Sequence, residues 1–249
     1  MRRECRLKSK WLVALTLIVI VCFAAFFAIL QFQPTATADK KTLYQVAAYN
    51  TFILGKYTGF VSFSELAKHG NFGLGTLNGL GEMVELNGVF YQIGIDGKPV
   101  KIDPSETTPY AAVTFFQADQ ILQVSNLNYT QLKDSITQAL PNQDSIYAIK
   151  VSGYFDYAQT RSEPRQTQPY QNITIALQNQ VLFNLTDVSG TAVGFWFPSN
   201  MNGVDLTGYH FHFITDDCTA GGHLLDCIAG NLTVQIDQIN KYELVLPSS

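Results

Sequence analysis

The apolar positions divide the chain into a short N-terminal segment and a long body. Residues 11–30 form an uninterrupted run without a charge, and residues 1–10 before them are basic. A basic start followed by an apolar run of this length is typical of a segment that enters a membrane with its basic end on the cytoplasmic side. Ala36-Thr37-Ala38 is a small-x-small pattern that a signal peptidase could cut. Residues 1–38 are therefore predicted to be a signal peptide or an uncleaved membrane anchor helix. Either places the body outside the cytoplasmic membrane, secreted or anchored to its outer side.

The body, residues 39–249, consists of short apolar runs separated by turn signals. Asn87-Gly88 between two such runs is a strong signal for a tight hairpin. Residues 129–139 are predicted to form a helix, because leucine and isoleucine recur there at a spacing of four. A short helix is also expected to begin at Ser64, a candidate N-cap. The other runs are predicted to be strands, at residues 60–63, 83–86, 89–95, 111–116, 146–155, 174–183, 191–197, 209–214, 223–228, 232–236 and 242–246.

Because strands dominate and the links are of hairpin length, the pattern predicts an α+β fold. We expect a mostly antiparallel or mixed β-sheet with a few helices, in which two halves share a sheet. A soft internal boundary is expected near residues 117–128. Hydrophobic residues make up 47% of the chain and charged residues 14%, so the body can fill a globular core.

Charge limits the classes of partner. The net charge is −4, and residues 1–38 contribute +4 through five basic residues and one acid, which leaves −8 on the rest. An acidic body without a basic patch argues against nucleic acid as a partner, because binding phosphates requires clustered Lys and Arg. Contact with a membrane is expected only through an uncleaved N-terminal segment.

Two cysteines, Cys218 and Cys227, lie in the body and flank a histidine. Two cysteines do not make a disulfide scaffold. They could pair outside the cell, lie near a metal, or pack as small, buried or half-buried apolar residues; the last reading is favoured.

Three of the four histidines cluster within a short stretch. His210 and His212 are two apart in a predicted strand, so their side chains point to one face. Residues 215–222 can fold the chain back and bring His223 onto the same face. His-x-His can also be ordinary polarity on an exposed strand, but three imidazoles at this spacing favour a metal site. Three protein ligands with an open position are typical of catalytic zinc, although other divalent metals also accept imidazole.

A metal at this site could act as a Lewis acid or activate a water molecule, and water activation needs a general base nearby. The sequence offers several carboxylates for that role without choosing among them: Glu82, Glu85, Asp216, Asp217 and Asp226.

The histidine run also resembles a signature of the α-acetolactate decarboxylase family. The resemblance extends over residues 43–247 and includes segments that match the family in order along the chain. These are Leu43-Tyr44-Gln45, Leu54-Gly55, Gly73-Leu74-Gly75-Thr76, Gly81-Glu82-Met83, Phe90-Tyr91-Gln92, Val151-Ser152-Gly153, Arg161-Ser162, Pro169-Tyr170 and Gly194-Phe195.

Enzymes of this family convert 2-acetolactate to acetoin and carbon dioxide. The resemblance implies that His210, His212 and His223 bind the metal and that Glu82 faces it with Thr76 beside it. It implies that Arg161 contacts the substrate, whereas the residue alone would be taken for a surface cation. The chemistry expected is decarboxylation through an ene-diolate stabilised by the metal, followed by protonation of one carbon. The resemblance also suggests a homodimer.

The sequence departs from the family pattern in two places. Residues 77–80 form a link one residue shorter than is usual before Glu82, and the chain given ends at Ser249 without the acidic tail that relatives can carry. These departures motivate an alternative: an exported metal-binding domain without turnover. A cupin-type oxygenase or isomerase is a third reading, weakened because Thr215, Asp216 and Asp217 stand where a cupin has its glutamate.

Overall fold

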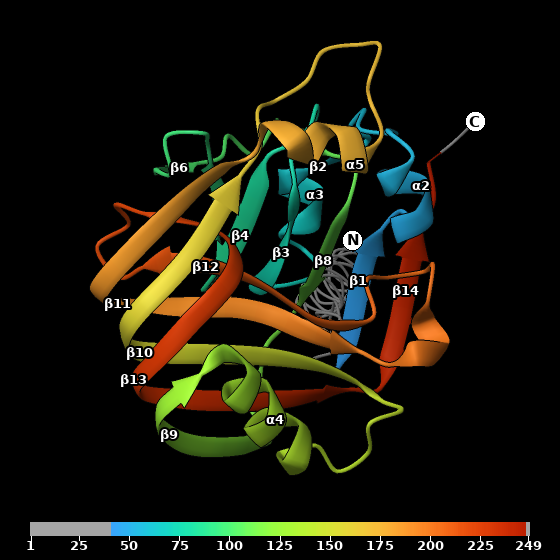
Figure 1. The fold of residues 1–249 in the computed structure, drawn as a ribbon. Helices are drawn as coiled ribbons and strands as arrows, with labels where there is room; N and C mark the ends of the chain where they lie inside the picture. The colour runs from blue at the N-terminus through green and yellow to red at the C-terminus, as the bar shows by residue number, and fades with distance from the viewer. Residues whose placement is uncertain (1–40, 248–249) are drawn as a thin grey trace, which may run out of the picture. The chain divides into compact units, whose positions relative to one another are not determined.

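The structure is a computed structural model that describes residues 41–247. The strands of this part of the chain form two large sheets and one small pair (Figure 1). The first sheet has the order β14-β1-β8-β3-β4-β5-β6. Its strands are β1 (Thr42–Val46), β3 (Phe72–Thr76), β4 (Glu82–Leu86), β5 (Val89–Ile93), β6 (Pro99–Lys101), β8 (Ala111–Thr114) and β14 (Lys241–Val245).

The second sheet has the order β10-β11-β12-β13-β9. Its strands are β9 (Gln120–Asn128), β10 (Ile146–Ser162), β11 (Val181–Phe197), β12 (Gly208–Thr215) and β13 (Gly221–Ile239). The small pair and the helices are β2 (Val61–Ser62), β7 (Thr107–Thr108), α2 (Tyr49–Ile53), α3 (Phe63–Leu66), α4 (Tyr129–Ala139), α5 (Ile173–Ala176), η1 (Leu177–Asn179) and η2 (Ser199–Met201).

These elements confirm the predicted fold class, an α+β protein with mostly antiparallel sheet and few helices. The chain passes from the first sheet to the second between β8 and β9. The two halves share a sheet through β14, which returns from the end of the chain and pairs in parallel with β1.

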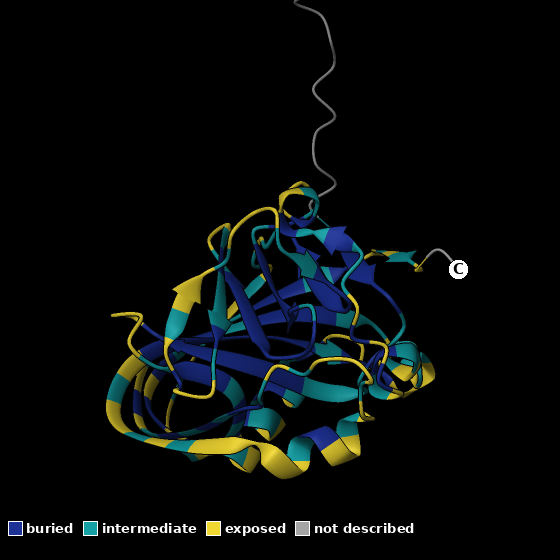
Figure 2. Cartoon of the chain, turned by 90° about the horizontal axis from the view of Figure 1, so that it is seen from above, coloured by how far each residue is buried: buried dark blue, intermediate teal, exposed yellow. Residues whose placement is uncertain are grey.

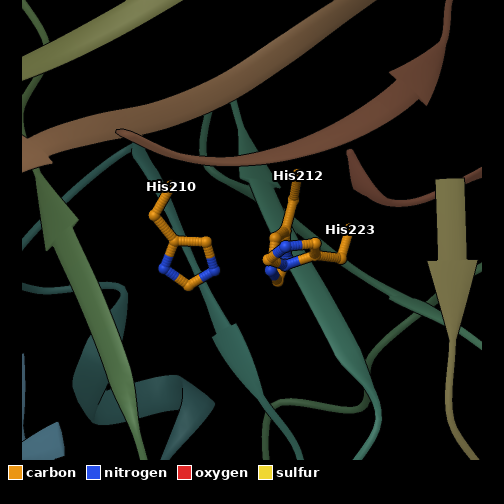
Figure 3. Close-up of side chains that lie close together, drawn as sticks. All are labelled: His210, His212 and His223. Carbon is orange, nitrogen blue, oxygen red and sulfur yellow. The ribbon is translucent and has the colours of Figure 1, made fainter. Parts of the chain in front are cut away.

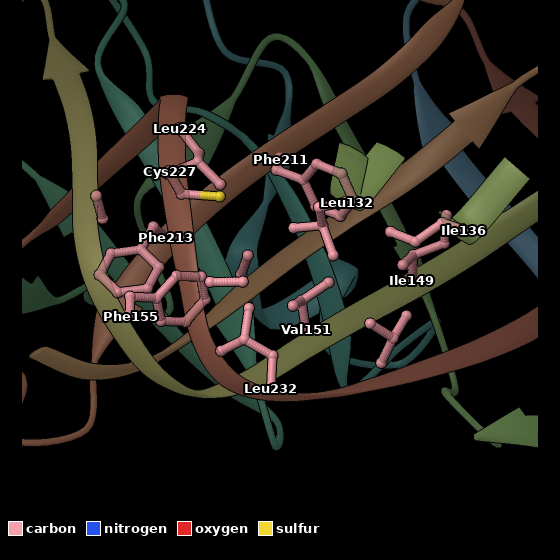
Figure 4. Packing of buried hydrophobic residues seen from close by; sticks show 14 of the residues in the cluster. Leu132, Ile136, Ile149, Val151, Phe155, Phe211, Phe213, Leu224, Cys227 and Leu232 are labelled. Atoms are coloured by element: carbon pink, nitrogen blue, oxygen red, sulfur yellow. The ribbon is translucent and has the colours of Figure 1, made fainter. Parts of the chain in front are cut away.

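The second sheet closes on itself. β10 pairs with β11 along one edge and with β13 along the other, so β10, β11, β12 and β13 form a small barrel. Two features mark the bend of the long strand β10. The pairing with β13 shifts register on either side of Phe155, and Gly153 nearby has a φ of +139°. Phe155, Phe213 and Leu224 fill the interior, and Leu132 and Ile136 of α4 belong to the same cluster (Figure 4).

The two large sheets pack face to face. Leu74 and Val84 of the first sheet contact a cluster that includes Val193, Phe195 and Ile214 of the second. In Figure 2 the buried residues follow the strands of the interior, and exposed residues follow the loops and outer edges. Because β4 lies against β12 and β13, side chains that leave β4 on this face reach the barrel wall.

Local predictions met mixed outcomes. The hairpin at Asn87-Gly88 and the helix at 129–139 are confirmed, and both turn residues have positive φ. Ser64 is not the N-cap of α3: the helix begins at Phe63, and its N-cap is Ser62, whose hydroxyl accepts the hydrogen bond from the Glu65 N–H. The strand predicted at 174–183 is wrong over its first part, because residues 173–179 form α5 and η1.

The two cysteines are unpaired. Cys227 is buried in the barrel core as expected, whereas Cys218 is exposed in the turn between β12 and β13.

The predicted export segment, residues 1–38, lies outside the described residues, so its role stays a prediction, as does the homodimer. Across residues 41–247, no helix combines the length and apolar character needed to cross a bilayer.

Candidate active site

The three histidines converge where β12 and β13 meet. His210 and His212 leave the same face of β12, and His223 of β13 lies directly opposite His212 in the strand register. Their potential ligand atoms all lie within 4.8 Å of one another, and the rings point into one space (Figure 3). The intervening Phe211 and Phe213 point into the barrel core, as alternation along a strand requires.

The environment of the rings fits a metal ion. The Nδ1 atom of His212 lies 2.8 Å from the Met83 carbonyl, which can only accept, so this nitrogen carries the hydrogen and the ring is oriented with Nε2 toward the cluster. The Nδ1 atom of His210 is buried and has no hydrogen-bond partner within residues 41–247. Burial, followed by the charge of His212, lowers the pKa of His210 to about 3, and burial and Arg161 hold the pKa of His223 well below its usual range. Neutral imidazoles are what a metal requires.

Glu82 faces this cluster from the opposing sheet. Its Oε2 atom lies 3.0 Å from Nε2 of His212, and its Oε1 atom accepts a 2.8 Å hydrogen bond from Nη1 of Arg161. Arg161 reaches this position because it pairs with His223 in the register of β10 and β13. Burial opposes ionisation of Glu82, but its interactions with His212 and Arg161 outweigh burial and hold the pKa of Glu82 well below its ordinary value.

Thr76 lies beside Glu82, its direct partner in the pairing of β3 with β4. The Thr76 hydroxyl is buried and makes no hydrogen bond to any described residue. All six residues expected at the site therefore border one cavity of about 100 Å³. The rest of its lining is Tyr49, Phe52, Gly75, Tyr110, Glu163, Ile173, Leu177, Leu206.

Residues 43–249 match the family model for alpha-acetolactate decarboxylase. The chain is 41% identical over 209 residues to the alpha-acetolactate decarboxylase of Methanosarcina mazei, covering 83% of this chain and 73% of that protein. It is 37% identical to that of Methylococcus capsulatus, covering 87% and 84%. The chain belongs to the alpha-acetolactate decarboxylase family.

The fold agrees with this assignment. The crystal structure of alpha-acetolactate decarboxylase from Bacillus subtilis superimposes with a TM-score of 0.81 at 34% identity, covering 84% of this chain and 90% of that one. The family predicted from the sequence motifs is thus confirmed, and with it membership in a family of carboxy-lyases.

The shorter link before Glu82 does not remove this residue from the site. Leu77 and Leu80 of the link are buried, and Leu80 donates its N–H to the Leu77 carbonyl. Gly79 has a φ of +85°, and its carbonyl accepts a hydrogen bond from Gln166 N–H. The link is thereby held against the segment that follows Arg161.

The other candidate carboxylates lie elsewhere. Glu85 is three residues after Glu82 and points to the opposite face of β4, where it is buried. Asp216, Asp217 and Asp226 are exposed and do not border the cavity.

One site residue was missed by the sequence analysis. Glu163 is 4% exposed, borders the cavity, and accepts a 2.6 Å hydrogen bond from Nη1 of Arg161. A signal was present, because residues i and i+2 of an extended segment share a face and Glu163 follows Arg161 at that spacing. The family motif quoted for this segment includes Arg161 but not Glu163.

Proposed function

We propose that this protein decarboxylates 2-acetolactate to acetoin and carbon dioxide. The observation that carries the proposal is the convergence of three imidazoles with Arg161 and Glu82 in one small cavity. The relatives that bear the name alpha-acetolactate decarboxylase support it at 34–41% identity over most of the chain.

His210, His212 and His223 would hold a divalent metal ion, with zinc as the first candidate. When bound, the metal supplies a Lewis acid, whose charge stabilises the negative charge that develops on the substrate's hydroxyl and keto oxygens.

Arg161 binds and orients the substrate carboxylate in this proposal. Its guanidinium is half of an ion pair with Glu82 on a buried wall of the cavity, and its planar fork has further N–H donors for an anionic ligand. Orientation matters because the carbon–carbon bond to the carboxylate must break while its electron pair moves toward the neighbouring carbonyl.

Glu82 moves the proton in this proposal. Loss of carbon dioxide leaves an ene-diolate that becomes acetoin only when one carbon gains a proton. The Oε2 atom of Glu82 faces the histidine cluster and Oε1 faces Arg161, so Glu82 can pass a proton from the arginine side of the site to the substrate side. Protonation from one fixed direction yields a single acetoin enantiomer.

The test is acetoin formation from racemic acetolactate by the purified, zinc-loaded protein, with and without a chelator. We expect activity that the chelator removes and zinc restores. Glu82→Gln and Arg161→Lys should each lower kcat by about 100-fold, the usual scale of a lost acid–base or orienting group. Glu85→Gln, on the opposite face of β4, is the matched control and should retain activity. A folded, metal-loaded protein that forms no acetoin would instead support a metal-binding domain without turnover.

A further inference from the structure

Glu163 forms a carboxyl pair with Glu82 across one guanidinium nitrogen. Nη1 of Arg161 lies 2.6 Å from Oε2 of Glu163 and 2.8 Å from Oε1 of Glu82. The side chains of Glu163 and Glu82 are 4% and 5% exposed, and that of Arg161 is 13% exposed. The single positive charge of Arg161 is thus shared between two buried carboxyl groups.

Two buried carboxyl groups in contact do not both ionise, because the second charge is repelled by the first. Burial, followed by the negative charge of Glu82, raises the pKa of Glu163 to about 9, although Arg161 acts in the opposite direction. Arg161 contacts both carboxyl groups and its single positive charge balances one carboxylate, not two. Near neutral pH the pair therefore holds one proton, and the raised pKa of Glu163 places that proton on Glu163.

Glu163 also connects the cavity to the outside. It borders the buried cavity of the histidines and a surface groove of about 370 Å³, and it is the residue common to the two linings. The groove is formed by residues of the link before Glu82, of β5 and of the segment after β10, including Gly81, Gln92 and Arg165. A proton from water in this groove can reach Glu163 without crossing the substrate position.

We propose that Glu163 is the proton reservoir of the site: it passes its proton to Glu82, which delivers it to the substrate carbon, and Glu163 is then reloaded from the groove. This inference rests on the proposed decarboxylation. In each turnover the carbon–carboxylate bond breaks and carbon dioxide leaves. The O–H bond of Glu163 breaks as its proton passes to Glu82, that proton forms the C–H bond on the substrate carbon and leaves Glu82 ionised again, and a proton from water in the groove reloads Glu163.

The reaction requires such a supply. The substrate is a carboxylate and the products are neutral, so each turnover consumes one proton. An ionised Glu82 cannot provide that proton by itself, whereas a neutral acid in contact with it can.

The groups that face Glu163 come from several elements. Glu82 on β4 and Arg161 on β10 contact it directly, and the buried hydroxyl of Tyr57, before β2, lies near enough that a charge on Glu163 would raise the pKa of this phenol. The Gly81 N–H donates a hydrogen bond to its carboxyl group. The pH response of Glu163 is therefore set by one neighbouring anion, one cation and one neutral phenol.

The decisive variant is Glu163→Gln, which keeps the size and the oxygen that accepts from Arg161 but cannot release a proton. We expect kcat to fall by about 100-fold with KM unchanged. In the unaltered protein kcat should decline above about pH 9, and this alkaline limb should be absent in the variant. Glu163→Asp should recover part of the activity. Glu85→Gln is the control, since it removes another buried glutamic acid that lies away from the cavity.

An infrared titration tests, without any turnover, whether Glu163 is protonated. The unaltered protein should show the carbonyl band of a protonated carboxylic acid that disappears near pH 9, and Glu163→Gln should lack it. Retention of kcat and of the alkaline limb in Glu163→Gln would overturn the proposal and leave Glu163 as an anchor for Arg161. If the unaltered protein itself makes no acetoin, the decarboxylation fails, while the infrared titration still decides whether Glu163 holds the proton.

Discussion

At the scale of single residues, two glutamates of β4 show how position on a strand decides chemistry. Glu82 and Glu85 are three residues apart, so they leave opposite faces of the strand. Glu82 meets His212 and Arg161, which stabilise its charge. Glu85 enters the apolar layer on the other side of the sheet, and neither of its carboxylate oxygens has a hydrogen-bond partner among the described residues. Burial raises the pKa of Glu85 to about 8.

Glu85 should therefore make the stability of the protein depend on pH. Its pKa in the folded state lies above the ordinary value of 4.5, so the folded state holds more protons between the two values. The free energy of unfolding should fall by a few kcal/mol as the pH rises from about 5 to about 8, since one pKa unit corresponds to about 1.4 kcal/mol. Glu85→Gln should be more stable at neutral pH and lose this slope.

Denaturant titrations at several pH values would measure this effect. Glu65→Gln, which alters a surface carboxylate paired with Lys68, is the control and should leave stability nearly unchanged, because exposed ion pairs contribute little. An unchanged slope in Glu85→Gln would contradict the assignment.

From sequence, only those site residues could be predicted that lie close together along the chain. His210 and His212 follow from alternation along one strand, and His223 from the hairpin after them. Glu82 and Arg161 came from the family resemblance, because nothing local reveals that β4 packs against β12. Glu163 was overlooked although it shares a face with Arg161, because the sequence does not show that this face is buried.

At the scale of elements, residues 173–176 show that a helix N-cap can outweigh the strand propensity of the residues that follow it. Ile173, Thr174 and Ile175 are β-branched and favour a strand. The Asn172 side chain nevertheless accepts a hydrogen bond from the Ile175 N–H and starts α5. The helix matters to the site, since Ile173 and Leu177 close one side of the cavity.

Asn172→Ala should therefore affect both stability and substrate binding. Loss of an N-cap costs about 1 kcal/mol, and a loss of that size in the cavity wall would raise KM up to about five-fold. Asn128→Ala is the matched control: it removes the capping box of α4, which lies at the barrel core away from the cavity. We expect it to cost a similar free energy of unfolding and leave KM unchanged. Equal KM values in the two variants would show that α5 does not shape the cavity.

At the scale of the whole molecule, the first described residues are tied to the last strands. Nζ of Lys41 forms ion pairs with Asp119 and Asp237, and the Asp237 side chain is fully buried. Asp237 also accepts a hydrogen bond from the Gln117 N–H, at the crossing from the first sheet to the second. This cluster fastens β1, the crossing and the end of β13 together.

Lys41→Met should destabilise the protein by about 3 kcal/mol, because it leaves Asp237 buried without its cationic partner. Lys68→Met, which breaks an exposed pair with Glu65, is the comparison and should cost less than about 1 kcal/mol. Thermal and denaturant unfolding would measure both. A small effect of Lys41→Met would mean that Gln117 and water satisfy Asp237.

The fold class could be predicted because alternation and hairpin signals are local, whereas the lengths of the long strands could not. β10, β11 and β13 run through polar and glycine positions that break the apolar pattern, so the sequence predicted them as shorter pieces. Their continuity depends on pairing along both edges, as β10 shows between β11 and β13.

The parallel pairing of β1 with β14 also affects how quickly the first sheet can form. Thr42 lies opposite Lys241, so a strand that is synthesised early waits for one that is synthesised much later. Such long-range pairings slow folding, because the chain must close a large loop before the contact forms. The first sheet stays open along this edge until β14 has left the ribosome, so this sheet is completed later than the hairpins formed by neighbouring strands.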